Sequence, residues 1–279
     1  MKYSALRHRI HEFCGGSRVK RILVFYFIGF LFVRSWHIRK AIWAWARKAP
    51  SRPLNILEAG GGLGQWPYRL TRMNNSWNVV SVDSDLLTVS EGNQFFQKCR
   101  INKGIFLHES LENHNKPNAY DMALLVDVVQ CYKSTENLLK KVHSNLRPCG
   151  NLILTTFTKT KGKAFVSLHN KGEKEEYYSK DGFSMAGLKK ILKEQGFRRI
   201  KAHYFMGNYG LWSWRIGFQF PLVATRSSFG LFCFYLLPFY YLLALPICGL
   251  LNIIDSTRVN RDGIGLIFYA EAKKEQDEC

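Results

Sequence analysis

The sequence predicts an α/β fold built on a largely parallel β-sheet. Ile56 to Glu58 has the apolar character of a buried strand that ends on a carboxylate, and Trp77 to Asp83 repeats this pattern. Glycines occupy every second position after the first strand, at Gly60, Gly62 and Gly64. Such a turn lets the backbone pass close to a bound ligand, because glycine tolerates unusual dihedral angles and has no Cβ.

The spacing of the glycines differs from that of a dinucleotide-binding turn. A dinucleotide-binding turn has the pattern GxGxxG, which would require a third glycine at the position of Gln65. The chain instead has GxGxG, with Glu58 two residues before the first glycine. Taken alone, this pattern leaves two alternatives open, an ordinary turn between strand and helix or a different nucleotide site.

Two more apolar strands are expected at Ile105 to Leu107 and Tyr120 to Asp127. In this order the landmarks resemble the class I S-adenosylmethionine-dependent methyltransferases. The resemblance implies an α/β fold with a Rossmann-like class I methyltransferase sheet of seven strands. Residues 146–154 then correspond to the helix end, Pro-Gly turn and fifth strand of that family. The last two strands, Arg198 to Phe205 and Ile264 to Ala270, are expected to pair antiparallel.

The resemblance also implies a binding site for S-adenosyl-L-methionine. In the family, a carboxylate at the position of Glu58 lies near the methionine part of this cofactor, and the glycines at Gly60, Gly62 and Gly64 line it. Asp83 corresponds to the acidic residue that accepts the ribose hydroxyls. The alternative role for Asp83 is to cap the N-terminus of a helix.

The remaining candidate residues follow the third, fourth and fifth strands. The family's adenine-binding position falls at Ser110 and Leu111, where an aspartate is commoner. Asp127 either faces the cofactor or caps a helix. The segment after it lacks the two prolines of amine methyltransferases and the Glu-His pair of many small-molecule enzymes. His169 is a weak candidate for a general base, with a solvated loop as the alternative.

Composition and charge predict that the protein binds an anionic surface, and they give no indication of a metal site. The seven cysteines form no CxxC pair and have no histidine at zinc spacing, so no metal site is expected. Residues 1–52 contain twelve Lys or Arg and one Glu, a net charge of +11 that attracts polyanions. Within them, Ile22 to Val33 is an uncharged run too short to span a bilayer. An interfacial anchor is favoured over a buried core helix.

A second apolar stretch, Ser227 to Ile254, carries no charge and is long enough for a transmembrane helix. A single crossing would leave the last strand on the wrong side of the membrane, unable to join the sheet. Pro238 and Pro246 are expected to divide the stretch into shorter, bent pieces. The prediction is a hydrophobic insertion that enters one leaflet, and the alternative is a lid or dimer interface in a soluble enzyme.

These observations predict four segments along the chain. Residues 1–53 form basic, membrane-proximal helices and 54–206 the methyltransferase domain. Residues 207–263 form the hydrophobic insertion, interfacial or re-entrant, and 264–279 hold the last strand and tail.

The predicted function is methyl transfer from S-adenosyl-L-methionine at the cytoplasmic face of a membrane, by a peripheral or monotopic protein that binds anionic lipid. The acceptor is expected to be a lipid-linked or apolar small molecule or glycan, methylated on oxygen rather than nitrogen. The apolar segments resemble those of bacterial, membrane-associated methyltransferases. Two alternatives remain, an RNA methyltransferase, although nucleic acid is an unlikely partner, and a membrane adaptor with a degenerate methyltransferase fold. The acceptor and the oligomeric state stay open.

Overall fold

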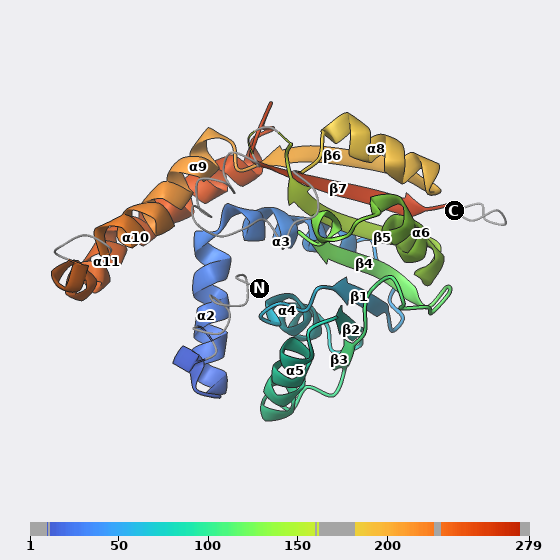
Figure 1. Cartoon of the computed structure of the whole chain (residues 1–279), viewed down its shortest axis with the longest axis horizontal. Helices are drawn as coiled ribbons and strands as arrows, with labels where there is room; N and C mark the ends of the chain where they lie inside the picture. Colours follow the sequence, from blue (N-terminus) through green and yellow to red (C-terminus); the bar gives the residue numbers. More distant parts are fainter. Residues whose placement is uncertain (1–9, 11, 160, 162–181, 226–229, 274–279) are drawn as a thin grey trace.

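The computed structural model describes residues 10, 12–159, 161, 182–225 and 230–273. Its centre is a seven-stranded sheet in the order β3-β2-β1-β4-β5-β7-β6 (Figure 1). The first five strands run parallel, whereas β7 lies antiparallel between β5 and β6. This arrangement confirms the predicted Rossmann-like sheet with an antiparallel last pair. The strands are β1 (Asn55–Ala59), β2 (Asn78–Asp83), β3 (Gly104–His108), β4 (Tyr120–Val126), β5 (Leu146–Phe157), β6 (Phe197–Phe205) and β7 (Gly265–Ala272).

Alternate residues of the central strands face two separate helix layers. Leu57 and Ala123 belong to a core that also contains helices α6 (Thr135–Asn145) and α8 (Met185–Glu194). Ile56 and Met122 face the opposite core, which contains α3 (Val33–Ala46) and α4 (Gln65–Met73). Helix α5 (Leu86–Lys98) lies over β2 and β3. Three of these helices, α5, α6 and α8, begin where an Asp or Ser side chain accepts a hydrogen bond from the first turn, at Asp85, Ser134 and Ser184.

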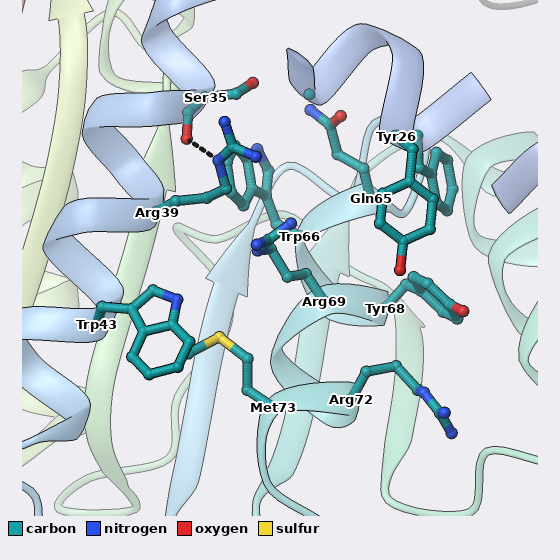
Figure 2. Close-up of a pocket in the computed structure, with 12 residues that line it drawn as sticks. Tyr26, Ser35, Arg39, Trp43, Gln65, Trp66, Tyr68, Arg69, Arg72 and Met73 are labelled. Atoms are coloured by element: carbon teal, nitrogen blue, oxygen red, sulfur yellow. Dashed lines mark hydrogen bonds between the residues drawn. The ribbon is translucent and has the colours of Figure 1, made fainter. Parts of the chain in front are cut away.

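Residues 18–46 of the basic N-terminal region form helices α2 and α3, which meet at a sharp bend. Helix α2 (Arg18–Leu31) is followed after Phe32 by α3, and the two helices differ in direction by 96°. Phe25 on α2 packs against the rings of Tyr68 and Phe95. Other α2 side chains are exposed, among them Leu23 at 61%. Together α2, α3 and α4 enclose a cavity (Figure 2).

The predicted insertion forms a helical hairpin that projects from the edge of the sheet (Figure 1). The outbound arm consists of α9 (Asn208–Trp214), a π-helical turn η2 (Arg215–Gln219) and α10 (Phe220–Thr225), and the return arm is α11 (Gly230–Thr257). Within the described residues, one helical stretch, Tyr235–Thr257, is long and apolar enough to cross a membrane.

From the sequence, Pro238 and Pro246 are expected to divide this stretch, and that prediction is wrong. Both prolines lie inside the single helix α11. Each removes one internal N–H donor, but α11 packs along α9, η2 and α10, and this packing keeps the arm continuous. Tyr240 and Tyr241 on α11 donate hydrogen bonds to the carbonyls of Ile216 at 2.6 Å and Gly217 at 2.9 Å in the π-helical turn.

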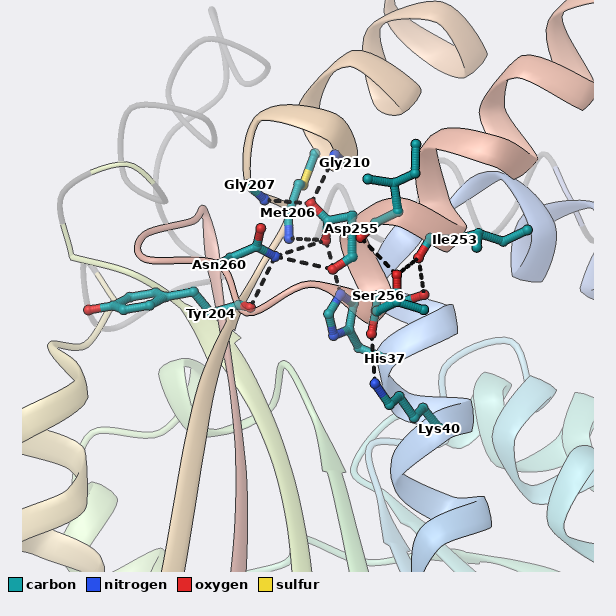
Figure 3. Close-up of polar contacts among 12 residues, drawn as sticks. His37, Lys40, Tyr204, Met206, Gly207, Gly210, Ile253, Asp255, Ser256 and Asn260 are labelled. Atoms are coloured by element: carbon teal, nitrogen blue, oxygen red, sulfur yellow. Dashed lines mark hydrogen bonds and ion pairs between the residues drawn. The ribbon is translucent and has the colours of Figure 1, made fainter.

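A buried carboxylate fixes the base of the hairpin (Figure 3). Asp255, near the end of α11, accepts hydrogen bonds from the backbone N–H groups of Met206, Gly207 and Gly210 at 3.0–3.2 Å. It therefore caps α9, whose own N-cap residue, Gly207, has no side chain. The ring of His37 on α3 lies 3.0 Å from the same carboxylate. Both arms and α3 are thus joined at one point beside β6.

Candidate functional site

The candidate site lies where the strand order of the sheet reverses. β1 is flanked by β2 on one side and by β4 on the other. Ligands of open α/β sheets bind in the crevice outside the carboxyl ends of the strands at such a point. The glycine turn from Gly60 to Gly64 leaves β1 there and leads into α4.

The backbone of this turn favours glycine. Gly60, Gly62 and Gly64 have φ angles of +79°, +50° and +83°, in the left-handed region that favours glycine. A Cβ on Gly60 would lie 2.8 Å from a methyl group of Val128. The backbone of the turn therefore lies close to Val128, and its close approach to a ligand stays a prediction.

Glu58 is the next-to-last residue of β1, just before the turn, and its side chain is buried. In the parallel register it lies opposite Ser81 of β2, whose hydroxyl donates a hydrogen bond to the carboxylate. Burial raises the pKa of Glu58 to about 8, the Ser81 bond opposes this shift, and the charge of Asp83 adds to it. The residue thus lies just before the glycine turn, as a family carboxylate is expected to do. Its role toward a cofactor stays a prediction.

Asp83 ends β2 next to the turn and is half-buried. Its carboxylate accepts the N–H of Gly62 at 3.4 Å and the N–H of Asp85 at 2.9 Å. The residue that caps α5 is Asp85, so the alternative role of Asp83 as a helix cap is wrong. The structure places its carboxylate directly beside the glycines, where a ribose would be expected.

Asp127 follows β4 with a φ angle of +54° and is paired with a cation. Its carboxylate forms an ion pair with Arg34 of α3 and accepts a hydrogen bond from Thr155 at 2.9 Å. The short helix η1 (Val129–Cys131) has no side-chain cap, so the capping alternative for Asp127 is also wrong. Arg34 was missed at the sequence level, because nothing local indicates that α3 reaches this edge of the sheet.

The other predicted residues lie at the neighbouring strand end or outside the described chain. Ser110 and Leu111 follow β3, and both form hydrogen bonds with Tyr132. Leu111 is 1% exposed and belongs to the core, which leaves the half-buried Ser110 as the more accessible of the two. His169 lies outside the described residues.

Helix α2 lies over the glycine turn, which the sequence did not indicate. The Arg21 guanidinium donates hydrogen bonds to the carbonyl of Leu63 at 2.8 Å and that of Glu91 at 3.2 Å. It also stacks on the ring of Phe95, 4.8 Å from the ring centre. The basic N-terminal region therefore contributes side chains to the edge of the sheet where the candidate site lies.

Comparison with known proteins supports the fold. No family model matches the chain, and no curated protein is similar to it in sequence. A Haemonchus contortus phosphoethanolamine N-methyltransferase 2 with bound phosphomonomethylethanolamine and S-adenosylhomocysteine has a similar structure (TM-score 0.59, 18% identity, 93% of this chain and 58% of that chain). A Thermotoga maritima S-adenosylmethionine-dependent methyltransferase, a possible histamine N-methyltransferase, is also similar (TM-score 0.53, 14% identity, 95% and 99%).

A third similar structure is the cyclase SpnF (TM-score 0.54, 14% identity, 80% of this chain and 75% of that chain). At these identities the likeness establishes the class I methyltransferase fold. Since a cyclase has the same fold, activity has to be argued from the residues of the site.

Proposed function

We propose that this chain is an S-adenosylmethionine-dependent methyltransferase. The observation that carries the proposal is the glycine turn, whose positive φ angles favour glycine and where a Cβ at Gly60 would lie 2.8 Å from Val128, together with the Asp83 carboxylate beside it. Backbone without side chains suits the extended methionine part of the cofactor, and a carboxylate at the end of β2 suits two ribose hydroxyls. The residues present therefore fit the cofactor.

The chemistry of the proposed reaction asks little of acid or base groups. The sulfonium of the bound cofactor supplies an electrophilic methyl group. The protein then has to hold the acceptor in line and exclude water. We propose α2 and α3 for this role, because Arg21 contacts the glycine turn and Arg34 pairs with Asp127 at the end of β4.

The acceptor is proposed to be an apolar or lipid-linked molecule, methylated on oxygen, at the cytoplasmic face of a membrane. Support comes from the exposed apolar surface of the hairpin, where Phe239, Leu242 and Leu243 are 70–73% exposed. Exposed apolar surface of this extent is typical of membrane or protein contact sites. The base of the hairpin joins β6 and β7 of one sheet, so the hairpin enters and leaves on the same side.

Calorimetric titration of the purified chain with S-adenosylmethionine and with S-adenosylhomocysteine tests the proposal. Asp83→Ala is expected to weaken binding by roughly 1.5–3 kcal/mol, the contribution of a hydrogen bond to a charged group. Asp85→Ala is the matched control, because this neighbouring carboxylate caps α5 and accepts the hydroxyl of Thr88 in the first turn of that helix at 2.6 Å. Tight binding that is equal in both variants would show that the assignment of Asp83 is wrong.

A further inference from the structure

A cavity of about 170 Å³ lies between α2, α3 and α4 (Figure 2). Arg39 of α3 and Arg69 of α4 project into it, and Arg72 lies at its rim. Aromatic side chains, including Trp43 and Trp66, form much of the remaining wall. No carboxylate is among the described residues that line it. The cavity is therefore both cationic and aromatic.

The two inner arginines have donors that nothing in the described chain accepts. Arg39 donates from Nε to the carbonyl of Ser35 in its own helix at 3.2 Å, and its guanidinium stacks on Trp36. Its Nη2 atom is buried without a hydrogen-bond partner, and so is Nε of Arg69. Burial, and to a smaller extent the charge of nearby Arg69, lower the pKa of Arg39 to about 10. The two cations thus lie close together.

Two partly buried arginines elsewhere in the described chain are neutralised by carboxylates. Arg34 pairs with Asp127, and Arg198 pairs with Glu271 at 2.8 Å. Buried charges are normally paired, because an uncompensated charge costs free energy in a low-dielectric surrounding. In the cavity between α2, α3 and α4, by contrast, two nearby arginines, Arg39 and Arg69, have no carboxylate among the described residues that line it. An anion from outside the described chain would supply the missing partner.

We propose that this cavity binds a phosphate group between Arg39 and Arg69. Two guanidinium groups offer paired N–H donors that match phosphate oxygens, and the volume accommodates a headgroup rather than a whole lipid. The surroundings suit a phosphate that carries an apolar chain, because Tyr26 and Trp43 at the cavity are 63% and 52% exposed and Leu23 continues the apolar face of α2. This site is distinct from the glycine turn and does not depend on methyl transfer.

Thermal unfolding of the full chain in an uncharged detergent tests the proposal, at constant ionic strength. The probes are inorganic phosphate and dioctanoyl phosphatidic acid. A ligand that binds only the folded state raises Tm with the logarithm of its concentration. Arg39→Gln and Arg69→Gln are each expected to increase the half-maximal concentration at least tenfold. Arg47→Gln is the control, since it lies at the end of α3, is exposed and does not line the cavity.

The ligand-free variants separate a binding role from a structural one. Removing one of two uncompensated charges should leave Tm unchanged or raise it, whereas loss of a structural arginine lowers it. The proposal is overturned if neither probe shifts Tm of the unaltered chain, or if both Gln variants respond as the unaltered chain does. A larger response to phosphatidic acid than to phosphate supports a lipid headgroup as the source, and equal responses support a free phosphate.

Discussion

Glu58 and Asp127 are carboxylates at the ends of neighbouring parallel strands, and the protein surrounds them in opposite ways. Asp127 has a cation, Arg34, within contact distance. Glu58 is 1% exposed and has a neutral hydroxyl, Ser81, as its hydrogen-bond partner. Burial and the nearby charge of Asp83 therefore raise its pKa to about 8. Ionised Glu58 is disfavoured in the folded state.

This shift predicts a pH dependence of stability. The unfolded chain has a Glu58 pKa near the ordinary 4.5, and the folded chain one of about 8. Between these values the folded state binds more protons, so the free energy of unfolding falls as pH rises. The free energy of unfolding of the unaltered chain should fall by roughly 3 kcal/mol between about pH 5 and pH 8 because of Glu58, and Glu58→Gln should abolish this part of the fall. Urea unfolding at each pH measures it. Glu112→Gln, at an exposed position, should leave the pH profile unchanged. Parallel profiles for all three proteins would contradict the assigned shift.

The sequence predicts the carboxylates of this edge but not their partners. Glu58, the glycines and Asp83 are recognisable because they follow apolar strands at fixed spacing. Ser81 could have been found from the same pattern, since parallel pairing of the two strands sets it opposite Glu58. Arg34 could not, because its contact with Asp127 joins residues 93 positions apart and depends on the path of α3 over the sheet.

At the scale of elements, the hairpin depends on one buried carboxylate, Asp255, at its base. Burial alone would raise the pKa of Asp255, but the hydrogen bonds from His37 and from backbone amides lower it below its usual value. The carboxylate is fully buried and His37 nearly so. Because the pKa is lowered in the fold, this contribution to stability is present at neutral pH and is lost in acid.

Asp255→Ala is expected to loosen the hairpin from the sheet. It leaves His37 and three backbone N–H groups without their buried acceptor, a change that costs about 3–5 kcal/mol. Urea unfolding in detergent measures the loss, and limited proteolysis reports whether residues 258–264 become accessible. Asp262→Ala removes an exposed pair with Lys161 and should cost less than about 1 kcal/mol. Equal losses in the two variants would contradict the role of Asp255.

The length of α11 shows where local sequence rules stop. Proline lowers helix stability at Pro238 and Pro246, and local reasoning therefore divides the stretch. Packing against the outbound arm keeps α11 continuous despite the prolines. Tyr240 and Tyr241 of α11 donate hydrogen bonds to carbonyls in the π-helical turn of that arm. The strands were easier to predict, since their apolar runs are bounded by glycine, proline and carboxylates.

For the whole molecule, a polar sheet domain carries an apolar arm. The exposed apolar residues of α11 include Tyr235, Phe239, Leu242, Leu243 and Leu250. Burying one such side chain contributes about 1.5–3 kcal/mol. The net charge of +19 adds attraction to anionic lipid, and salt screens that part of the binding.

Flotation with lipid vesicles tests whether apolar burial and electrostatic attraction both contribute to membrane binding. The chain is expected to float with anionic vesicles more than with neutral ones. It should stay bound in about 1 M salt, which screens most of the electrostatic attraction but not the apolar burial. Leu242→Asn combined with Leu243→Asn should weaken binding roughly tenfold or more. Val259→Asn is the control, because Val259 is 83% exposed but lies beyond α11. A chain that remains soluble without detergent and ignores vesicles would favour the lid or dimer interface instead.

The position of β7 has a consequence for how the protein is made. β7 lies between β5 and β6, yet it is synthesised after both of them and after the whole hairpin. As the chain leaves the ribosome, the facing edges of β5 and β6 therefore have no partner until residues 265–272 emerge. Unpaired strand edges and exposed apolar surface both promote aggregation. During that interval a nearby bilayer would cover the apolar surface of the hairpin until β7 is synthesised and completes the sheet.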